Sequence, residues 1–215
     1  MTLIDPDTVS ETNCVRQPFC RTDIGFPKAI VLVNRTNLFW GLNWQGMQAQ
    51  IQQLTKGSDI DFVIGCVDTR KARRAIDKWV LSARILYWLD IGNNASSGQF
   101  VLGQPMNSAN RKRKNRLPTV AEMYPEIVSA NSREDDQPSC GAAEALTRQE
   151  PFINQNLAYQ ALAMLTQLLR HGSLSYQGGF CNIASGHVVP LPIRASVAVR
   201  RCGKDVNSGR AAGRL

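Results

Sequence analysis

The stretch LIDPDTVSETNCVRQ, residues 3–17, decides the fold that the sequence predicts. Its apolar start, Leu3 and Ile4, leads directly into Asp5, and a short apolar run that ends in an acid is typical of a β-strand. In open α/β sheets ligands bind at the C-terminal edge of the strands, and an acid there commonly holds a ribose hydroxyl. Such an acid normally follows a glycine-rich phosphate loop by about 20 residues. Because only four residues precede Asp5, the stretch predicts a nucleotide-binding strand without that loop before it.

The same pattern returns at residues 60–68, IDFVIGCVD, where the closing acid is Asp68. A continuous apolar run of this kind indicates a buried parallel strand. Between the two strands we expect a helix that begins at a cap-like Asp23 and ends at Gly41. The elements expected in the first half are strands at residues 3–5, 60–68, 84–93 and 98–105, and helices at residues 23–42 and 70–83. Their alternation predicts an α/β fold with a doubly wound, Rossmann-like sheet and right-handed crossovers.

The second half of the chain has a different organisation. In chain order we expect a basic linker (106–116), a short helix (118–128), a loop (129–140), a long amphipathic helix (152–172), a β-hairpin (178–193) and a tail (194–215). The long helix should end at Gly172. The leucines expected to pack on the sheet are Leu157, Leu162, Leu165 and Leu169. We therefore expect one domain over residues 1–193, followed by a basic, disordered tail rich in Arg, Gly and Ser.

The net charge of +8 is unevenly distributed. Residues 111–116 and 194–215 together hold eleven basic residues and one acid, which leaves 14 basic and 16 acidic residues in the rest of the chain. The basic segments could touch phosphate nonspecifically, but a solvated loop and a disordered tail are the favoured interpretation. No aromatic stacking motif accompanies the charge, so nucleic-acid binding ranks lowest among the functions considered.

The six cysteines contain no Cys-x-x-Cys pair, and the chain has two histidines, so no zinc is expected. The N-terminus lacks the features of a signal peptide, and no apolar run approaches the roughly 18 residues that span a bilayer. We expect a cytoplasmic protein that is not bound to a membrane. Cys66, inside the run 60–68, is expected to be a packing residue.

Several motifs together resemble one known family. DPDTVSETNCVRQ (5–17), DIGFPKA (23–29) and VIGCVDTRKARR (63–74) are similar to the ThiF/MoeB/HesA group of ubiquitin-activating-type adenylyltransferases. The family pattern is an Asp-x-Asp-x-Val strand end, an Asn-x-x-Arg-Gln element, an Ile-Gly-x-x-Lys helix start and a later Asp-Asn-x-x-x-Arg element. Residues 89–105 and 138–165 resemble more narrowly the ThiF-related member of the PRTRC cassette of bacterial mobile elements. The resemblance covers roughly residues 2–193.

The resemblance implies a role for each matching residue. Asp5, together with Asp7 in the same strand-end motif, would bind ATP, with Asp5 accepting hydrogen bonds from the ribose hydroxyls. Asn13, Arg16 and Gln17 would line the phosphate side, and Arg16 would bridge phosphates. Lys28 would hold the β- and γ-phosphates as a point charge. Asp68 would bind Mg²⁺, which suits an ion held by carboxylate, water and phosphate. The residues with implied catalytic roles are Arg16, Lys28, Asp68 and Cys140.

The sequence departs from the family pattern in three places. Thr69 stands where the family has Asn after the metal-binding Asp, and the zinc-binding cysteine pairs are missing. The family's first strand, glycine-rich loop and helix would precede Met1, so the expected domain lacks this unit. The backbone N–H groups of that loop would normally cradle the phosphates.

Local alternatives stay open for three residues. Asp5 could be an exposed turn acid in DPDT, although the spacing of the other motifs favours the nucleotide role. Asp68 could cap the helix that follows it instead of binding metal. Cys140 could take an acyl group as a thioester, because a helix N-terminus favours thiolate, or it could have no role in chemistry. Arg70, Arg73 and Arg74 could contact a substrate tail, with Arg70 the best placed because it is nearest Asp68, but a solvated helix face is the favoured interpretation.

The function that the resemblance implies is ATP-dependent adenylation of the C-terminal carboxylate of a ubiquitin-like or sulfur-carrier protein. The alternative is a catalytically impaired pseudoenzyme, or an interaction module of a plasmid-borne PRTRC cassette. A homodimer is expected because family members often dimerise through the sheet domain.

Overall fold

The computed structural model describes residues 1–54, 60–130 and 150–193, and it describes Val15 and Arg16 by their backbone alone. The predicted tail at 194–215, most of the predicted loop at 129–140 and Cys140 lie outside these residues.

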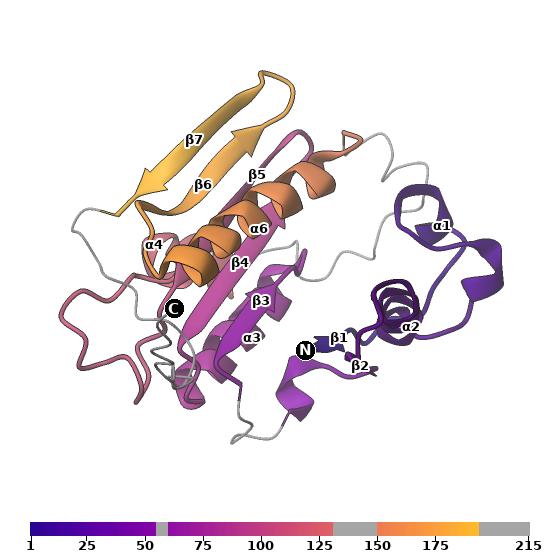
Figure 1. Cartoon of the computed structure of the whole chain (residues 1–215), viewed down its shortest axis with the longest axis horizontal. Coiled ribbons are helices and arrows are strands. Elements are labelled where there is room, and N and C mark those ends of the chain that lie inside the picture. Colours follow the sequence, from indigo (N-terminus) through magenta and orange to yellow (C-terminus); the bar gives the residue numbers. More distant parts are fainter. Residues whose placement is uncertain (55–59, 131–149, 194–215) are drawn as a thin grey trace, which may run out of the picture.

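The strands form two sheets (Figure 1). In the small sheet, β1 (Thr2–Ile4) pairs in parallel with β2 (Gln45–Met47). The large sheet has the order β3-β4-β5-β6-β7. Its strands are β3 (Phe62–Gly65), β4 (Tyr87–Asn93), β5 (Ser97–Gly103), β6 (Tyr176–Asn182) and β7 (His187–Pro192). The β3–β4 pair is parallel and the other three pairs are antiparallel, so the large sheet is mixed.

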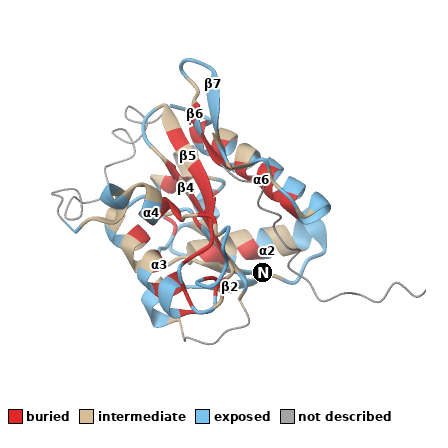
Figure 2. Cartoon of the chain, turned by 90° about the vertical axis from the view of Figure 1, so that its left-hand side faces the viewer, coloured by how far each residue is buried: buried red, intermediate tan, exposed pale blue. Residues whose placement is uncertain are grey.

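Helices cover both faces of the large sheet, which confirms the predicted α/β class. On one face α6 (Ile153–His171) packs on Tyr87 and Leu89, and on the other α3 (Arg70–Ser82) packs on Trp88. Successive residues of a strand point to opposite faces, which explains why these neighbours on β4 belong to separate cores. Figure 2 shows the buried residues concentrated on β4, β5 and the inner side of α6.

The prediction for α6 is correct in its extent and wrong in part of its packing. The helix ends where Gly172 adopts a left-handed conformation with φ 68°. Leu157 and Leu165 are buried as expected, but Leu162 is 54% exposed and Leu169 is 68% exposed. The buried stripe runs instead through Leu157, Ala161, Met164, Leu165 and Leu168. Leu162 and Leu169 each follow a stripe residue by one position, which turns them about 100° around the helix.

The helix expected from Asp23 begins later than predicted. Asp23 belongs to a short 3₁₀ helix, η1 (Arg21–Asp23), where its Oδ2 accepts hydrogen bonds from the Cys20 amide at 2.7 Å and from Arg35 at 2.6 Å. The α-helix itself is α2 (Lys28–Trp40), which follows Pro27. Its end at Gly41, in a left-handed conformation with φ 62°, confirms the predicted stop. Because α2 begins at residue 28, Lys28 and not Asp23 lies in the first turn of this helix.

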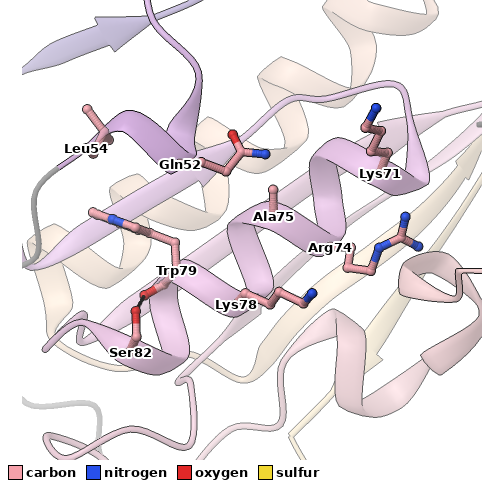
Figure 3. Close-up of a pocket in the computed structure, with 8 residues that line it drawn as sticks. All are labelled: Gln52, Leu54, Lys71, Arg74, Ala75, Lys78, Trp79 and Ser82. Atoms are coloured by element: carbon pink, nitrogen blue, oxygen red, sulfur yellow. Dashed lines mark hydrogen bonds between the residues drawn. The ribbon is translucent and has the colours of Figure 1, made fainter.

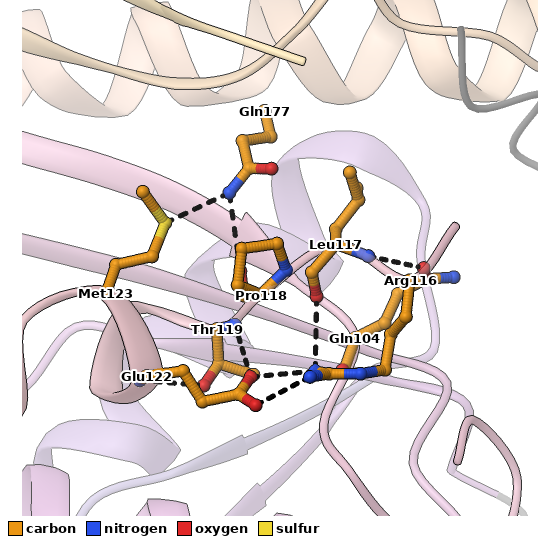
Figure 4. A network of polar contacts seen from close by, with 8 residues as sticks. All are labelled: Gln104, Arg116, Leu117, Pro118, Thr119, Glu122, Met123 and Gln177. Atoms are coloured by element: carbon orange, nitrogen blue, oxygen red, sulfur yellow. Dashed lines mark hydrogen bonds and ion pairs between the residues drawn. The ribbon is translucent and has the colours of Figure 1, made fainter. Parts of the chain in front are cut away.

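The basic linker is anchored at both ends and exposed in its middle. Asn107 is buried, and its side-chain amide donates to the carbonyls of Val80 at 2.9 Å and Ile85 at 2.8 Å. At the other end Arg116 makes two hydrogen bonds, of 2.6 and 2.7 Å, to the carboxylate of Glu122 in α4 (Val120–Met123), as Figure 4 shows. Residues 111–115 are exposed, and Arg116 is half-buried. The predicted solvated loop is therefore confirmed for those five residues.

The remaining short elements are α1 (Asn13–Arg16), η2 (Ile51–Gln53) and η3 (Pro125–Val128). The described part of the chain holds no helix with the length and apolar character that crossing a membrane requires.

Candidate nucleotide site

Asp5 lies directly after β1 and is held by the neighbouring strand. Its backbone N–H donates to the carbonyl of Met47 at 3.1 Å, and its Oδ1 accepts a hydrogen bond from the Asp7 amide at 2.8 Å. The carboxylate therefore does stabilise a turn, as the simpler interpretation of DPDT expects. The residue is also half-buried, so it is not the fully exposed turn acid of that interpretation.

Lys28 connects the start of α2 to the same turn. Its backbone N–H donates to the Asp7 carbonyl at 3.0 Å, and its Nζ forms an ion pair with Asp7 Oδ2 at 2.9 Å. The Lys28 side chain is 14% exposed, whereas that of Asp7 is 64% exposed. In this arrangement Asp7 supplies the anion for a largely buried ammonium group.

The electrostatics of Asp5 connect the turn with Asp68, which is more than sixty positions away in the sequence. Burial raises the pKa of the Asp5 carboxyl above its ordinary value, and the charges of Asp7 and Asp68 raise it further. The amide of Asp7 and the ammonium group of Lys28 oppose that rise in pKa. Four of the predicted site residues, Asp5, Asp7, Lys28 and Asp68, therefore lie within one electrostatic neighbourhood.

Asp68 is an exposed carboxylate that follows β3 by three residues. The open alternative, in which Asp68 caps the next helix, is wrong. The cap of α3 is Thr69, whose hydroxyl oxygen accepts a hydrogen bond from the Ala72 amide at 3.1 Å. Thr69 thus has a structural role at the position where the family has Asn, and Asp68 is not used as the cap.

The predicted residues of α1 contribute unequally. Asn13 is buried, and its side-chain oxygen accepts hydrogen bonds from the backbone N–H of Ser10 at 2.9 Å and from the Ser10 hydroxyl at 3.0 Å. Its amide oxygen is therefore occupied by the fold. Arg16 is the last residue of α1, and half-buried Gln17 follows it with its N–H bonded to the Asn13 carbonyl. The contacts of the Arg16 side chain lie outside the described part of the structure.

Arg73 is the residue whose role the sequence analysis missed. Its Nε donates to Oδ1 of Asp90 at 2.9 Å, and its Nη2 donates to the Val67 carbonyl at 2.8 Å. Arg73 and Asp90 are both buried, so the predicted solvated helix face is wrong for Arg73. Since Val67 directly precedes Asp68, the guanidinium group fixes the segment that carries the acid. The signal available in the sequence was the spacing of Asp68 and Arg73, which matches the family's Asp-Asn-x-x-x-Arg element.

Arg74 is also not free in solvent. Its Nη1 donates to the carbonyls of Val128 at 3.3 Å and Ser129 at 2.6 Å. The guanidinium group therefore ties α3 to the end of η3, and the expected solvated face is wrong for this residue too.

Cys66 is not a packing residue of a buried strand, because β3 ends at Gly65 and Cys66 is exposed. Although the residue reaches solvent, protein atoms crowd its thiol, and this partial desolvation, together with the charge of Asp90, raises the pKa of Cys66 to about 11. A thiol with that pKa is protonated near neutral pH, which makes Cys66 a poor nucleophile. Cys140, the predicted thioester residue, lies outside the described residues.

Asp68 is the residue that the sequence analysis predicted to bind a metal ion. Among the described residues, no three His, Cys, Asp or Glu side chains gather in a way that could hold a metal. Mg²⁺ commonly keeps several waters and is bound through one or two carboxylates and substrate phosphates. The exposed carboxylate of Asp68 is compatible with that mode of binding.

Comparisons with known proteins agree with the observed fold. A model of the ThiF family matches residues 1–196. The selenomethionine structure of PaaA is similar, with a TM-score of 0.60 and 12% identity over 89% of this chain and 55% of that chain. E. coli MccB has a TM-score of 0.57 and 14% identity over 99% of this chain and 60% of MccB. MccB solved with ATP has a TM-score of 0.55 and 16% identity over 94% of this chain and 58% of that chain.

The chain spans less than two thirds of the length of these solved structures. A search of curated protein sequences finds no match. At these identities the similarity concerns the fold.

Proposed function

The chain belongs to the ThiF family, and on that premise we propose that it activates a carboxylate by adenylation with ATP. The substrate that we propose is the C-terminal carboxylate of a ubiquitin-like or sulfur-carrier protein. The observation that carries the proposal is that Asp7 joins Asp5 to Lys28: its amide donates to Asp5 Oδ1 at 2.8 Å, and its carboxylate pairs with Lys28 Nζ at 2.9 Å. The charge of Asp68 also acts on the Asp5 carboxyl, whose pKa it raises. The similarity to MccB, solved with ATP and with MccA, supports the proposal.

Each of these residues has the chemistry that its proposed role requires. Asp5 offers a carboxylate acceptor for ribose hydroxyls at the end of a strand, the position at which α/β sheets bind ligands. Lys28 offers a largely buried ammonium group for phosphate. Its Nζ is bonded to Asp7 Oδ2, and because an ammonium group has three N–H donors, it can donate to a phosphate oxygen as well. The side-chain oxygen of Asn13 is already bonded to Ser10, so this residue would act by fixing the turn at the start of α1.

The proposed reaction brings anions together. A carboxylate oxygen of the partner protein attacks the α-phosphorus of ATP, the bond from that phosphorus to the β-phosphate oxygen breaks, and pyrophosphate leaves. Cations are needed to position the phosphates and to neutralise the developing charge. Lys28 and Arg16 would supply this charge from the protein, and Mg²⁺ held at Asp68 would supply the rest.

A second step is proposed for Cys140. Its thiolate would attack the acyl carbon of the adenylate, form a thioester and displace AMP. Cys66 is the poorer nucleophile for this step, because its raised pKa keeps the thiol protonated near neutral pH. We also propose a homodimer, as family members often form one through the sheet domain.

The proposal is tested by ATP–pyrophosphate exchange with the full chain. Candidate ubiquitin-like proteins from the same genome are supplied one at a time, each with and without its last residue. Labelled pyrophosphate should enter ATP only with an intact partner. Absence of exchange with every candidate, under conditions in which the chain binds ATP, would contradict the adenylation step.

One observation favours the alternative function. In that alternative the chain is a catalytically impaired pseudoenzyme, or an interaction module of a PRTRC cassette. The ammonium group of Lys28 is already paired with Asp7. If that pair persists with nucleotide present, a partner protein would bind without any exchange. Measuring partner binding and exchange on the same samples distinguishes the two functions.

A further inference from the structure

The two helices that flank the large sheet differ in what lies on their outer sides. Beside α3 lies η2, with a pocket of about 500 Å³ between them (Figure 3). Lys71 and Arg74, two of the cations that line this pocket, already interact with other groups of the chain. On α6, by contrast, residues 153–169 include no charged side chain, and the side that faces away from the sheet is exposed (Figure 2). An exposed apolar surface on an uncharged helix is typical of an interaction site.

The exposed side of α6 carries one row of residues, which we call the α6 row. Its members are Phe152, Gln155, Tyr159, Leu162, Thr166 and Leu169, and all six are exposed. The four large apolar members are each more than half exposed. Successive members are three or four positions apart, which is the spacing of a helix seam that packs on a second helix.

The α6 row has the same spacing when it is read in either direction. If two copies of α6 pack antiparallel about a twofold axis at the middle of the row, Tyr159 lies opposite the partner's Leu162. The same axis places Phe152 opposite the partner's Leu169, and the two polar members also oppose each other. Because the row complements itself in this way, the same patch on two identical chains can form one closed interface.

The charges at the two ends of α6 favour the antiparallel arrangement. Glu150 lies just before the helix, Arg170 lies in its last turn, and both side chains are exposed. Neither residue forms an ion pair with another residue of the described structure. Antiparallel packing brings Glu150 beside the partner's Arg170 at both ends of the row, whereas parallel packing would place like charges together. Antiparallel helix dipoles add a further attraction.

We propose that the α6 row binds the same row of a second copy of this chain, in antiparallel orientation. Ala158 and Ala163, which lie beside the row, are exposed and small, so the two helices can approach closely. The proposal rests on the homodimer proposed above and assigns its contact surface. It needs neither ATP nor the adenylation step.

The test is sedimentation velocity of the full chain over a concentration series. The unmodified chain should pass from monomer to dimer as its concentration rises. Leu162→Glu should weaken dimerisation at least about tenfold, because each copy would then bury an unpaired carboxylate against the partner's Tyr159. The matched control is Leu38→Glu, which makes the same change at an exposed leucine of α2 and should alter dimerisation by less than about twofold. Because both leucines are exposed in the single chain, both variants should keep the circular dichroism spectrum of the unmodified protein.

An exchange of charges tests the orientation. Glu150→Arg should weaken dimerisation about two- to tenfold, because two exposed ion pairs become repulsive. The double variant Glu150→Arg/Arg170→Glu should restore dimerisation, since the same pairs form with their charges exchanged. Failure of the double variant to dimerise more strongly than Glu150→Arg would overturn the antiparallel contact.

Two further outcomes separate this contact from the homodimer itself. Dimerisation that survives Leu162→Glu would overturn the α6 row as the contact surface, while a homodimer formed through another surface would stand. An unmodified chain that stays monomeric throughout the series would overturn both.

Discussion

The guanidinium group of Arg73 and the carboxylate of Asp90 form a buried ion pair, with Arg73 Nε 2.9 Å from Asp90 Oδ1. Asp90 lies on β4, in register with Gly65 at the end of β3. A further N–H of Arg73 is bonded to the carbonyl of Val67, beside Asp68. The pair therefore links the central sheet, α3 and the segment that presents the proposed metal-binding acid.

Removing one partner of this pair should strongly destabilise the protein. Arg73→Ala leaves the Asp90 carboxylate buried without its counter-ion, and we expect the free energy of unfolding to fall by about 3–5 kcal/mol. Urea denaturation followed by circular dichroism measures the change. The double variant Arg73→Met/Asp90→Leu should regain much of the loss, because neither charge is then buried alone. A double variant no more stable than Arg73→Ala would show that the pair contributes through packing and not through charge.

Substitutions at the neighbouring residues Asp68 and Thr69 should have different effects, one on the proposed reaction and the other on the stability of the fold. Thr69→Ala removes the cap of α3, and we expect a loss of about 1 kcal/mol in the free energy of unfolding. Asp68→Asn changes an exposed side chain that does not cap the helix, so stability should change by less than about 0.5 kcal/mol. Its effect should appear in Mg²⁺-dependent ATP–pyrophosphate exchange. An Asp68→Asn variant with unchanged exchange would remove Asp68 from the proposed reaction.

Neutralising Asp7 should strengthen phosphate binding. In Asp7→Asn the ammonium group of Lys28 no longer has its ion-pair partner, so its charge is not offset and pyrophosphate is not repelled by a neighbouring carboxylate. We expect the affinity for pyrophosphate, measured by isothermal titration calorimetry, to rise about two- to fivefold, the range of a single exposed ion pair. Glu11→Gln is the matched control, because it makes the same change in charge at another exposed acid nearby in sequence. An equal gain in the control would assign the effect to net charge.

Adenosine binding should depend on pH through Asp5. Because burial raises the pKa of the Asp5 carboxyl, this group takes up its proton at a higher pH than an ordinary Asp does as the solution is acidified. A protonated carboxyl is a weaker acceptor for ribose hydroxyls. As the solution is acidified, the affinity for adenosine should therefore begin to fall at a higher pH than the titration of an ordinary Asp would predict. Adenosine is the suitable ligand because it has no phosphate that titrates. In Asp5→Asn the affinity should be low throughout and insensitive to pH over the same range.

The same shift has a consequence for stability with a defined sign. The folded protein binds a proton at Asp5 more readily than the unfolded chain does, so this residue's contribution favours folding at low pH. That contribution is lost as pH rises through the raised pKa. Asp5→Asn should therefore flatten the pH dependence of the free energy of unfolding in the acidic range.

Two leucines of α6 provide a direct test of its orientation. Leu157→Ala should cost about 2–5 kcal/mol, because the side chain is buried against the sheet. Leu162→Ala, at a position that is 54% exposed, should change stability by less than about 0.5 kcal/mol. Thermal denaturation of the two variants measures the difference. Similar losses in both would contradict the observed orientation.

Local patterns in the sequence predicted several features of the structure. The stops at Gly41 and Gly172 follow from the left-handed backbone conformation that glycine tolerates at a helix end. The strand that precedes Asp5 follows from a short apolar run that ends in an acid, and the α/β class follows from the order of strands and helices along the chain. The grouping of Asp5, Lys28 and Asp68 was expected from the family resemblance, since their spacing in the chain does not reveal it.

What the sequence determined by itself was the type of each element and the chemistry available at its ends, because propensity and periodicity are local properties of the chain. Tertiary structure alone decided which of these groups meet. Arg73 and Lys78 both lie on α3, yet one is buried against Asp90 and the other is exposed. Burial depends on which face of a helix meets the sheet, and that is set by packing between segments distant in sequence. For the same reason the split into two sheets and the exposure of Leu162 could be learned only from the folded chain.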